Sequence, residues 1–357
     1  MADRTVRRLF LVVALLFSVS LIVGQGCASG PPFKPKADAP AHHLEVGFRN
    51  PFVDENSSPS RLLIARFWVR RIWASLSEPD LVVNLPRAHN NGKLLRDNGH
   101  EATVTWVGHS TLLVQLEGMN FLTDPHWGER ASPVNFTGPK RFSEPGLRFE
   151  DLPRIDFVVI SHDHYDHLDL STVLRLAETH HPRFFVPLGL KEWFLNIGID
   201  DVVELDWWEG STFKQFTITC VPAQHFSGRT PWDRNRTLWA GWVVAGREKK
   251  LYFAGDTGYN ERLSEIGRRL GPFQLAAIPI APYGATNAVR INHVTPEEAL
   301  QLFLDVKGDR FVSIHWGTFF MPQAFDEPIK RVESEAERLQ IASEWLYLLK
   351  HGESRSW

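Results

Sequence analysis

Short apolar runs recur along the chain from residue 102 onwards, and segments with helical spacing separate several of them. Runs of roughly four to eight residues that are apolar, or that alternate with polar residues, are typical of β-strands. They predict strands at residues 103–107, 111–116, 120–124, 157–161, 184–187, 202–205, 213–221, 238–245, 250–254, 275–280 and 310–314. Helices are predicted at residues 170–180, 261–270 and 296–305. This alternation predicts an α/β fold with mixed sheets.

Two of the predicted helices carry signals for their first turn. Ser171 is the predicted cap of the helix at 170–180. The helix at 296–305 is preceded by Thr295 as its cap and opens with Pro296 and two glutamates. Acidic side chains in a first turn are stabilised by the positive end of the helix dipole, so the sequence marks the start of the helix at 296–305 clearly.

The N-terminus has the pattern of an export signal. Arginines 4, 7 and 8 precede an apolar run over residues 9–23, which is short for a membrane span. Gly26-Cys27 follows and resembles a bacterial lipoprotein cleavage site. Residues 1–26 are therefore predicted to be an export signal or membrane anchor, with Cys27 as the lipidated residue. An uncleaved anchor and ordinary secretion are the alternatives. The expected location is the bacterial cell envelope, with the protein anchored to a membrane and its main domain outside the cytoplasm.

Two further segments precede the main domain. Residues 27–59 are rich in Pro, Ser, Asn and Lys, which is typical of a linker, and His42-His43 is interpreted as part of it rather than as a metal site. Residues 60–100 are predicted to be an extension that packs on the core. Within it, residues 60–77 form a basic amphipathic pattern, either a packed helix or one that contacts anionic headgroups. Residues 101–357 form the predicted main domain.

Composition narrows the class of protein. With 357 residues, 43% of them hydrophobic, the chain can bury a sizeable core. Its formal net charge of −3 argues against nucleic acid as a partner. Cys27 and Cys220 are the two cysteines, so no intramolecular disulfide is expected if Cys27 is lipidated. Cys220 is predicted to be a core residue, with a zinc thiolate as the alternative.

The densest chemistry lies directly after the apolar run at 157–160. His162, His164, Asp166 and His167 stand within six consecutive residues, at the predicted end of a buried strand. A loop this short spreads the four side chains too widely for one metal ion. We expect His162 and His164 to face one metal and Asp166 and His167 to face a second. Imidazole and carboxylate ligands favour zinc at neutral pH.

Three other ligand-type residues follow predicted strands. His225 follows the strand at 213–221, Asp256 follows the strand at 250–254, and His315 follows the strand at 310–314. A single histidine at a strand end is usually structural. Four such strand ends in order, beginning with the dense cluster, indicate one metal site assembled at the edge of the sheets.

This order of motifs resembles the metallo-β-lactamase superfamily, and within it the family of N-acyl-phosphatidylethanolamine-hydrolysing phospholipase D and its bacterial relatives. The resemblance runs from about residue 106 to the C-terminus. The histidine motif identifies the superfamily alone. The segments specific to the phospholipase-like branch are Gly138-Pro139-Lys140-Arg141-Phe142, Asp206-Trp207-Trp208 and Lys350-His351-Gly352-Glu353-Ser354. The resemblance implies an αββα sandwich of two mixed sheets flanked by helices.

The resemblance also implies roles for individual residues. One zinc ion would be held by His162, His164 and His225, the other by Asp166, His167 and His315, with Asp256 as the bridge between two Zn²⁺. Asp256 and His293 are the expected catalytic residues, His293 by contact with the phosphate or the departing oxygen, or else as a structural residue. His109 and Asp124 are expected to support the ligands from beneath. Residues 281–290 depart from the more aromatic stretch usual in the lipid-hydrolysing enzymes.

We therefore expect a dinuclear zinc hydrolase that cleaves a phospholipid headgroup, with the membrane contacted through the N-terminus. Three alternatives stay open. The first is hydrolysis of a lactone or other carbonyl ester that is small and soluble. The second is oxygen chemistry on two irons, although related iron enzymes usually have Glu where this chain has His164. The third is a non-catalytic envelope lipoprotein that retains its metal site.

Overall fold

The computed structural model describes residues 39–53, 85–230, 232–284, 287–319 and 324–357. The predicted export signal, Cys27 and the amphipathic segment at 60–77 lie outside these residues. Within the described part, no helix has both the length and the apolar character needed to cross a membrane.

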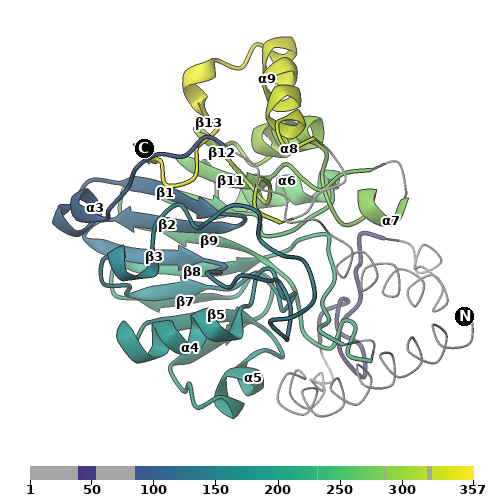
Figure 1. Cartoon of the computed structure of the whole chain (residues 1–357). Coiled ribbons are helices and arrows are strands. Elements are labelled where there is room, and N and C mark those ends of the chain that lie inside the picture. Colours follow the sequence, from purple (N-terminus) through teal and green to yellow (C-terminus); the bar gives the residue numbers. More distant parts are fainter. Residues whose placement is uncertain (1–38, 54–84, 231, 285–286, 320–323) are drawn as a thin grey trace, which may run out of the picture.

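Two seven-stranded sheets form the centre of the molecule (Figure 1). The first has the order β14-β1-β2-β3-β4-β5-β6 and the second the order β13-β12-β11-β10-β9-β8-β7. The first sheet contains β1 (Thr103–Gly108), β2 (Thr111–Leu116), β3 (Met119–Thr123), β4 (Phe157–Val159), β5 (Arg183–Pro187), β6 (Val202–Leu205) and β14 (Ser354–Ser356). The second contains β7 (Gly210–Phe213), β8 (Phe216–Val221), β9 (Gly241–Ala245), β10 (Lys250–Phe253), β11 (Leu275–Pro279), β12 (Phe311–Ile314) and β13 (Leu346–Tyr347).

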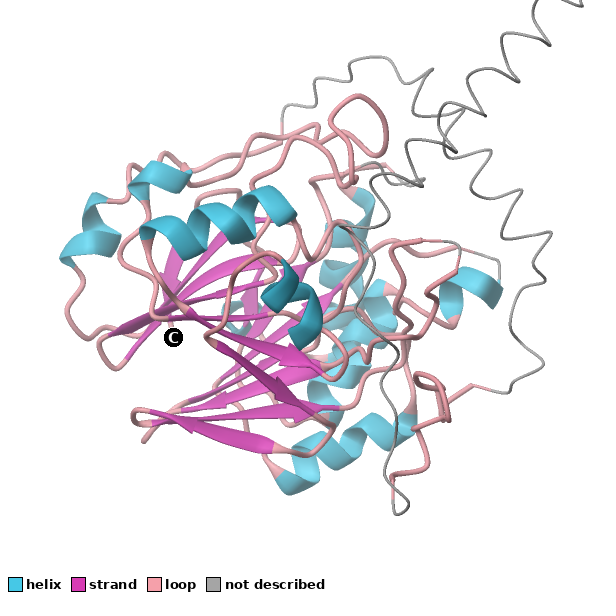
Figure 2. Cartoon of the chain, turned by 90° about the horizontal axis from the view of Figure 1, so that it is seen from below, coloured by secondary structure: helices cyan, strands magenta, loops and turns pink. Residues whose placement is uncertain are grey.

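The two sheets share one pattern of strand directions. In the first, β14, β1, β2 and β3 pair antiparallel, and β3 to β6 pair parallel. In the second, β7 to β10 pair antiparallel, and β10 to β13 pair parallel. Both sheets are therefore mixed, and Figure 2 shows them face to face with helices on the outer sides. The predicted αββα sandwich is confirmed.

Seven α-helices lie in the described residues. They are α3 (Lys93–Asp97), α4 (Leu170–Thr179), α5 (Lys191–Asn196), α6 (Ser264–Arg269), α7 (Asn287–Arg290), α8 (Pro296–Asp305) and α9 (Glu327–Leu339). Of these, α4, α8 and α9 are the longest. Helix α8 has the predicted bounds, and Thr295 and Glu298 cap each other's backbone N–H groups in a capping box. Helix α4 is capped by Asp169, whose carboxylate accepts from the backbone N–H of Thr172, so the prediction of Ser171 as its cap was wrong.

Strand β4 is apolar at every position because both of its faces are covered. Phe157 and Val159 point into the space between the sheets, while Val158 belongs to the cluster beneath the outer helices. Both faces are covered, so successive residues are buried whichever way they point. The outer cluster joins strand residues Leu113, Leu122, Val158 and Phe184 to helix residues Val173, Leu176, Trp193 and Phe194. Cys220 is fully buried in the inner cluster, which confirms the prediction that it is a core residue.

A predicted strand and a predicted helix differ in extent from the structure. The alternating run at 213–221 contains the turn of a hairpin, in which β7 ends at Phe213 and β8 begins at Phe216, because Lys214 takes a left-handed backbone (φ 52°) that reverses the chain. The predicted helix at 261–270 begins as a 3₁₀ turn over Glu261–Leu263 and becomes α-helical only at Ser264.

Residues 39–53 pack against the sandwich, although the composition of residues 27–59 is typical of a linker. Phe48 is 1% exposed, and its backbone N–H donates to the carbonyl of Asn235 at 2.8 Å. His42 is buried as well and pairs with Asp206. One buried aromatic ring and one ion pair are sufficient to fix this segment, and neither is visible in the overall composition.

Candidate metal centre

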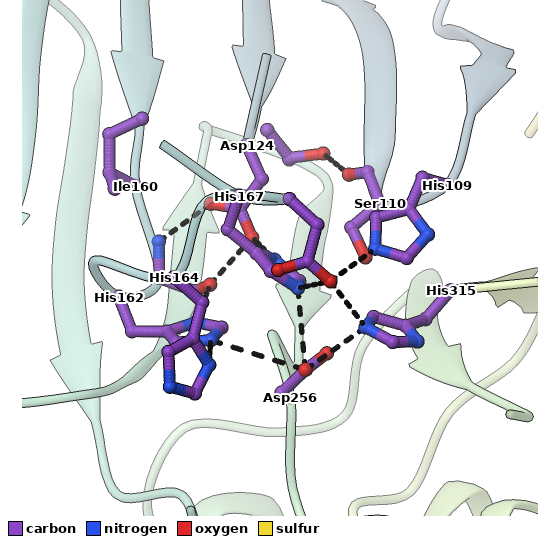
Figure 3. Close-up of polar contacts among 12 residues, drawn as sticks. His109, Ser110, Asp124, Ile160, His162, His164, His167, Asp256 and His315 are labelled. Carbon is purple, nitrogen blue, oxygen red and sulfur yellow. Dashed lines mark hydrogen bonds and ion pairs between the residues drawn. The ribbon is translucent and has the colours of Figure 1, made fainter. Parts of the chain in front are cut away.

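The predicted ligands lie at the ends of strands from both sheets. The loop after β4 carries His162, His164, Asp166 and His167, while the other three follow β8, β10 and β12. Figure 3 shows imidazoles and carboxylates from these loops pointing toward one small region, with Asp256 between them. The structure therefore brings together all seven residues that were predicted as ligands. Their role as ligands stays a prediction.

Three histidines form the first half of the centre. The Nε2 atom of His162 lies 2.8 Å from Nδ1 of His164, and that same Nδ1 lies 3.3 Å from Nε2 of His225. A ligand atom from each of the three fits within 4.8 Å of the other two. His162 and His225 are almost fully buried. This half offers imidazole nitrogens alone, an arrangement suited to zinc.

The second half contains a carboxylate. The Oδ2 atom of Asp166 lies 3.6 Å from Nε2 of both His167 and His315. His109 joins this half, because its Nε2 atom lies 3.1 Å from the same carboxylate oxygen. His109 was predicted to support the ligands from beneath, yet it stands within ligand distance of the other three.

Asp256 lies between the two halves. Its Oδ2 atom is 3.0 Å from Nε2 of His315 and 3.3 Å from Nε2 of His167. The same oxygen is 3.7 Å from Nε2 of His225 and 4.0 Å from Nε2 of His162. One carboxylate oxygen thus faces histidines from both groups, which is the position that a bridging ligand requires.

Hydrogen bonds on the far side of the ligands orient two of the imidazole rings. Asp124 accepts from Nδ1 of His167 at 2.7 Å and from the backbone N–H and hydroxyl of Ser161. Nδ1 of His225 lies 2.9 Å from the backbone carbonyl of Asn292. In both rings an acceptor engages Nδ1, so Nε2 is the nitrogen that faces the centre. The structure places Asp124 where the predicted support residue should lie.

The backbone is strained at three residues of the centre. His109, Asp124 and His315 have φ angles of 51°, 36° and 60°, which lie in or near the left-handed region that residues other than glycine seldom occupy. Strain of this kind costs of order 1–3 kcal/mol per residue and is concentrated at functional sites.

The surroundings lower the pKa values of the three histidines in the first half and raise those of His167 and His315 in the second. In the first half, burial lowers the pKa of His162, brings that of His164 to about 4 and brings that of His225 to about 3. In the second half burial also acts, but the carboxylates of Asp256 and Asp166 outweigh it. They raise the pKa of His315 to about 9 and that of His167 well above its usual value.

Both central carboxylates stay ionised despite their burial. Burial alone raises a carboxyl pKa, but the nearby imidazoles of His167 and His315 hold the pKa of Asp256 well below its usual range. His167 and His109 do the same for Asp166. The centre therefore presents two anionic carboxylates and, in its first half, three neutral histidines to a cation.

The donor set fits a metal pair. Among the described residues, buried atoms that have no hydrogen-bond partner gather at this point, namely Nε2 of His167, Nε2 of His315 and Oδ1 of Asp256. Leaving such groups unpaired costs roughly 1–3 kcal/mol each, so a cation that binds them offsets this cost. Cys220 is not among the described clusters of possible ligands, which argues against the zinc-thiolate alternative.

His293 lies at the open side of the centre. Its Nδ1 atom is 3.8 Å from Oδ2 of Asp256, and its side chain is 16% exposed, which is more than the 2% of Asp256. Burial lowers the pKa of His293 to about 3. The ring stands close enough to the bridging carboxylate to contact a bound substrate, as the catalytic prediction requires.

Two residues that the sequence analysis did not single out join the ligand loops. Asp163 accepts from the backbone N–H of Gly228 at 2.7 Å, and burial raises the pKa of its carboxyl to about 6. Arg229 donates to the backbone carbonyls of Asp163 and Leu168, which lie at the two ends of the histidine loop. These contacts fix the histidine loop to the segment that carries His225. The signal for Asp163 in the sequence was its position as an acidic residue between His162 and His164.

Comparison with known proteins agrees with this architecture. Residues 119–316 match the family model described as a β-lactamase superfamily domain. The chain is 47% identical to N-acyl-phosphatidylethanolamine-hydrolyzing phospholipase D 1 of Caenorhabditis elegans over 61% of this chain and 64% of that protein. It is 33% identical to the mitochondrial N-acyl-phosphatidylethanolamine-hydrolyzing phospholipase D of Saccharomyces cerevisiae over 65% of this chain and 51% of that protein. The chain thus spans less than two thirds of the length of either relative.

A solved structure shares the fold. The metallo hydrolase Igni18 of Ignicoccus hospitalis superposes with a TM-score of 0.56 at 22% identity, over 72% of this chain and 98% of that one. The family model covers more than half of the chain, and the ligand clusters lie within the matched fold. This chain belongs to the β-lactamase superfamily-domain family. Within that family it is similar to N-acyl-phosphatidylethanolamine-hydrolyzing phospholipase D proteins, as the sequence resemblance predicted.

Proposed function

We propose that this protein is a dinuclear zinc phosphodiesterase that removes the headgroup of a membrane phospholipid. The observation that carries the proposal is the position of Asp256, whose Oδ2 atom faces His315 and His167 on one side and His225 and His162 on the other. A single metal site does not need a carboxylate shared between two groups of histidines. The all-imidazole first half favours zinc over harder cations.

Individual residues of the chain have different roles in such a reaction. Two zinc ions held by these ligands would lower the pKa of a water molecule to about 7 and would polarise the phosphoryl oxygens of a substrate. Asp256 sets the spacing of the two groups of ligands. His293 stands 3.8 Å from Asp256 at the open side, where it contacts the phosphate or passes a proton to the departing oxygen.

The lipid substrate is supported by the relatives. Two of them carry the name N-acyl-phosphatidylethanolamine-hydrolyzing phospholipase D. For this chain we propose the same class of cleavage, in which water breaks the bond between phosphorus and the headgroup oxygen. The products are a phosphatidic acid and an alcohol such as an N-acylethanolamine. Residues 281–290, which depart from the aromatic stretch usual in the lipid-hydrolysing enzymes, are where a different substrate preference would arise.

Headgroup release tests the activity. The zinc-loaded full chain is mixed with a panel of phospholipids in detergent micelles, and the released alcohol is measured against the variant Asp256→Asn. We expect release of an N-acylethanolamine by the wild type and none by the variant. If the protein leaves every phospholipid intact yet opens a small lactone or cleaves a soluble phosphodiester, the lipid assignment is wrong and the hydrolase assignment remains.

We also propose that the protein is held at the membrane of a bacterial cell envelope by a lipid on Cys27. The support is the sequence alone, a charged and apolar N-terminus followed by Gly26-Cys27. Radiolabelled palmitate should enter the wild type, and the Cys27→Ser variant should carry none. Label that persists in the variant would refute the lipidation site.

A further inference from the structure

A second cluster of metal-ligating side chains lies outside the strand-edge centre. It consists of His42 and His43 from the N-terminal segment and Asp206, which directly follows β6. We propose that these three residues bind one divalent transition-metal ion of the zinc class, and that this ion fastens residues 39–53 to the catalytic sandwich. The proposal does not depend on the function of the strand-edge centre.

The geometry is compact enough for one ion. Nε2 of His42 lies 2.7 Å from Oδ1 of Asp206, and Nε2 of His43 lies 2.8 Å from Oδ2 of the same carboxylate. In the strand-edge centre, the nitrogen atoms of His162 and His164 approach to the same 2.8 Å. A ligand atom from each of the three residues lies within 4.8 Å of the other two.

Packing holds the three side chains in place. His42 stacks on Trp207 with 4.4 Å between ring centroids, and His43 meets the ring of Phe48 edge-on at 5.3 Å. The Asp206 carboxylate also accepts from the backbone N–H of Trp207 at 2.7 Å. The side chains of His42, His43 and Asp206 are 9%, 5% and 9% exposed. A preformed cluster pays little ordering entropy when it binds an ion.

The charges favour a cation. Asp206 is a buried anion, and the Glu209 side chain lies beside it and accepts from its backbone N–H at 2.9 Å. A divalent ion bound between His42, His43 and Asp206 would compensate the charge of this buried carboxylate. Two imidazoles and one carboxylate are a donor set for zinc and its first-row neighbours.

The ion would act as a structural clasp. Its ligands come from residues 42 and 43 on one side and residue 206 on the other, so it closes a long loop between the N-terminal segment and the turn that joins β6 to β7. A metal that closes a long loop stabilises the folded chain because the unfolded chain loses more freedom. The segment fastened in this way leads directly to the N-terminal region that precedes residue 39.

Zinc counting tests the clasp. The full chain is stripped with a chelator, reloaded with Zn²⁺ and desalted, and zinc per chain is measured for the wild type, for His43→Gln and for His89→Gln. His89 is an exposed histidine and serves as the matched control. We expect His43→Gln to bind one zinc fewer than the wild type and His89→Gln to bind the same number. The difference is independent of how many ions the strand-edge centre holds.

Equal zinc content in His43→Gln and the wild type would overturn the proposal, and the three residues would then be a hydrogen-bonded clamp alone. Circular dichroism checks that each variant is folded. If His43→Gln does not fold, Asp206→Asn replaces it, because the amide keeps the size of the side chain and its oxygen can still accept from the backbone N–H of Trp207. Turnover of the loaded His43→Gln protein should equal that of the wild type, so a failure of the proposed hydrolase function stays distinguishable from a failure of the clasp.

Discussion

The two halves of the strand-edge centre use the same imidazole chemistry in different surroundings. The first half consists of His162, His164 and His225, which lie close to one another, and burial lowers the pKa of each. His167 and His315 face the carboxylates of Asp166 and Asp256, which raise the pKa of both. Without metal, the first half is therefore neutral at pH 7, and the second half is a set of buried ion pairs.

This difference has a consequence for metal binding. Zinc binds neutral imidazole, so the first half is ready to accept it, while His167 and His315 must first lose their protons. The second half nevertheless has one advantage for metal binding, because it contains the carboxylate of Asp166. A bound cation would take the place of the protons on His167 and His315 and would balance the charge of the carboxylates. Asp256 belongs to both halves, and its removal should therefore disturb both at once.

Replacing Asp256 should have the largest effect. Asp256→Asn removes the anionic oxygen that faces both groups of histidines, so we expect turnover to be abolished and zinc at the strand edge to be reduced in both halves. Thermal unfolding of the metal-free protein should still be cooperative. A variant that retains both ions and wild-type turnover would show that the two halves are not joined through this carboxylate.

Replacing His293 should affect turnover and leave the halves intact. This ring lies on the open side and orients none of the predicted ligands, so His293→Ala should lower kcat by roughly 10²–10⁴-fold if the residue transfers a proton. Zinc content should stay unchanged. A loss of zinc in this variant would instead assign His293 a ligand role, and unchanged turnover would leave it a structural residue.

Replacing Asp124 should lower zinc affinity in the second half and leave the first half unchanged. In wild-type protein, Oδ2 of Asp124 accepts from Nδ1 of His167. In Asp124→Asn an amide nitrogen can take the place of this oxygen. His167 then carries its proton on Nε2, which is the atom that faces Asp256. Zinc affinity of the second half should fall roughly 10–100-fold, while the first half keeps its affinity. A two-step zinc titration resolves the halves, and an equal loss in both steps would contradict their independence.

The smallest effect concerns a buried carboxylate outside the centre. Burial raises the pKa of Glu204, although the hydrogen bond that its carboxylate accepts from the backbone N–H of Lys191 acts in the opposite direction. A carboxyl whose folded pKa is raised loses stability as pH rises from the unfolded pKa through the folded one. Glu204→Gln should therefore raise Tm at pH 7 by about 1–3 °C and leave it unchanged near pH 4. A larger gain at pH 4 than at pH 7 would reverse this interpretation.

The centre was predictable because its ligands follow strands. Four ligand-type residues in six positions after an apolar run stand out without any structure, and Asp256 and His315 each follow a strand directly. The contact between His42 and Asp206 was not predictable, because 164 residues separate them and the local composition is typical of a linker. The turn at Lys214 was missed for a related reason, since neither glycine nor asparagine marks the left-handed residue.

A crystal structure of the zinc-loaded protein, with anomalous data collected at the zinc edge, tests the central claim most directly. We expect two anomalous peaks at the strand edge, roughly 3.5–4 Å apart. One should be bound by His162, His164 and His225, the other by Asp166, His167 and His315, with Asp256 between the two. A single peak at this edge in an active preparation, or two peaks that Asp256 does not contact, would contradict the dinuclear account.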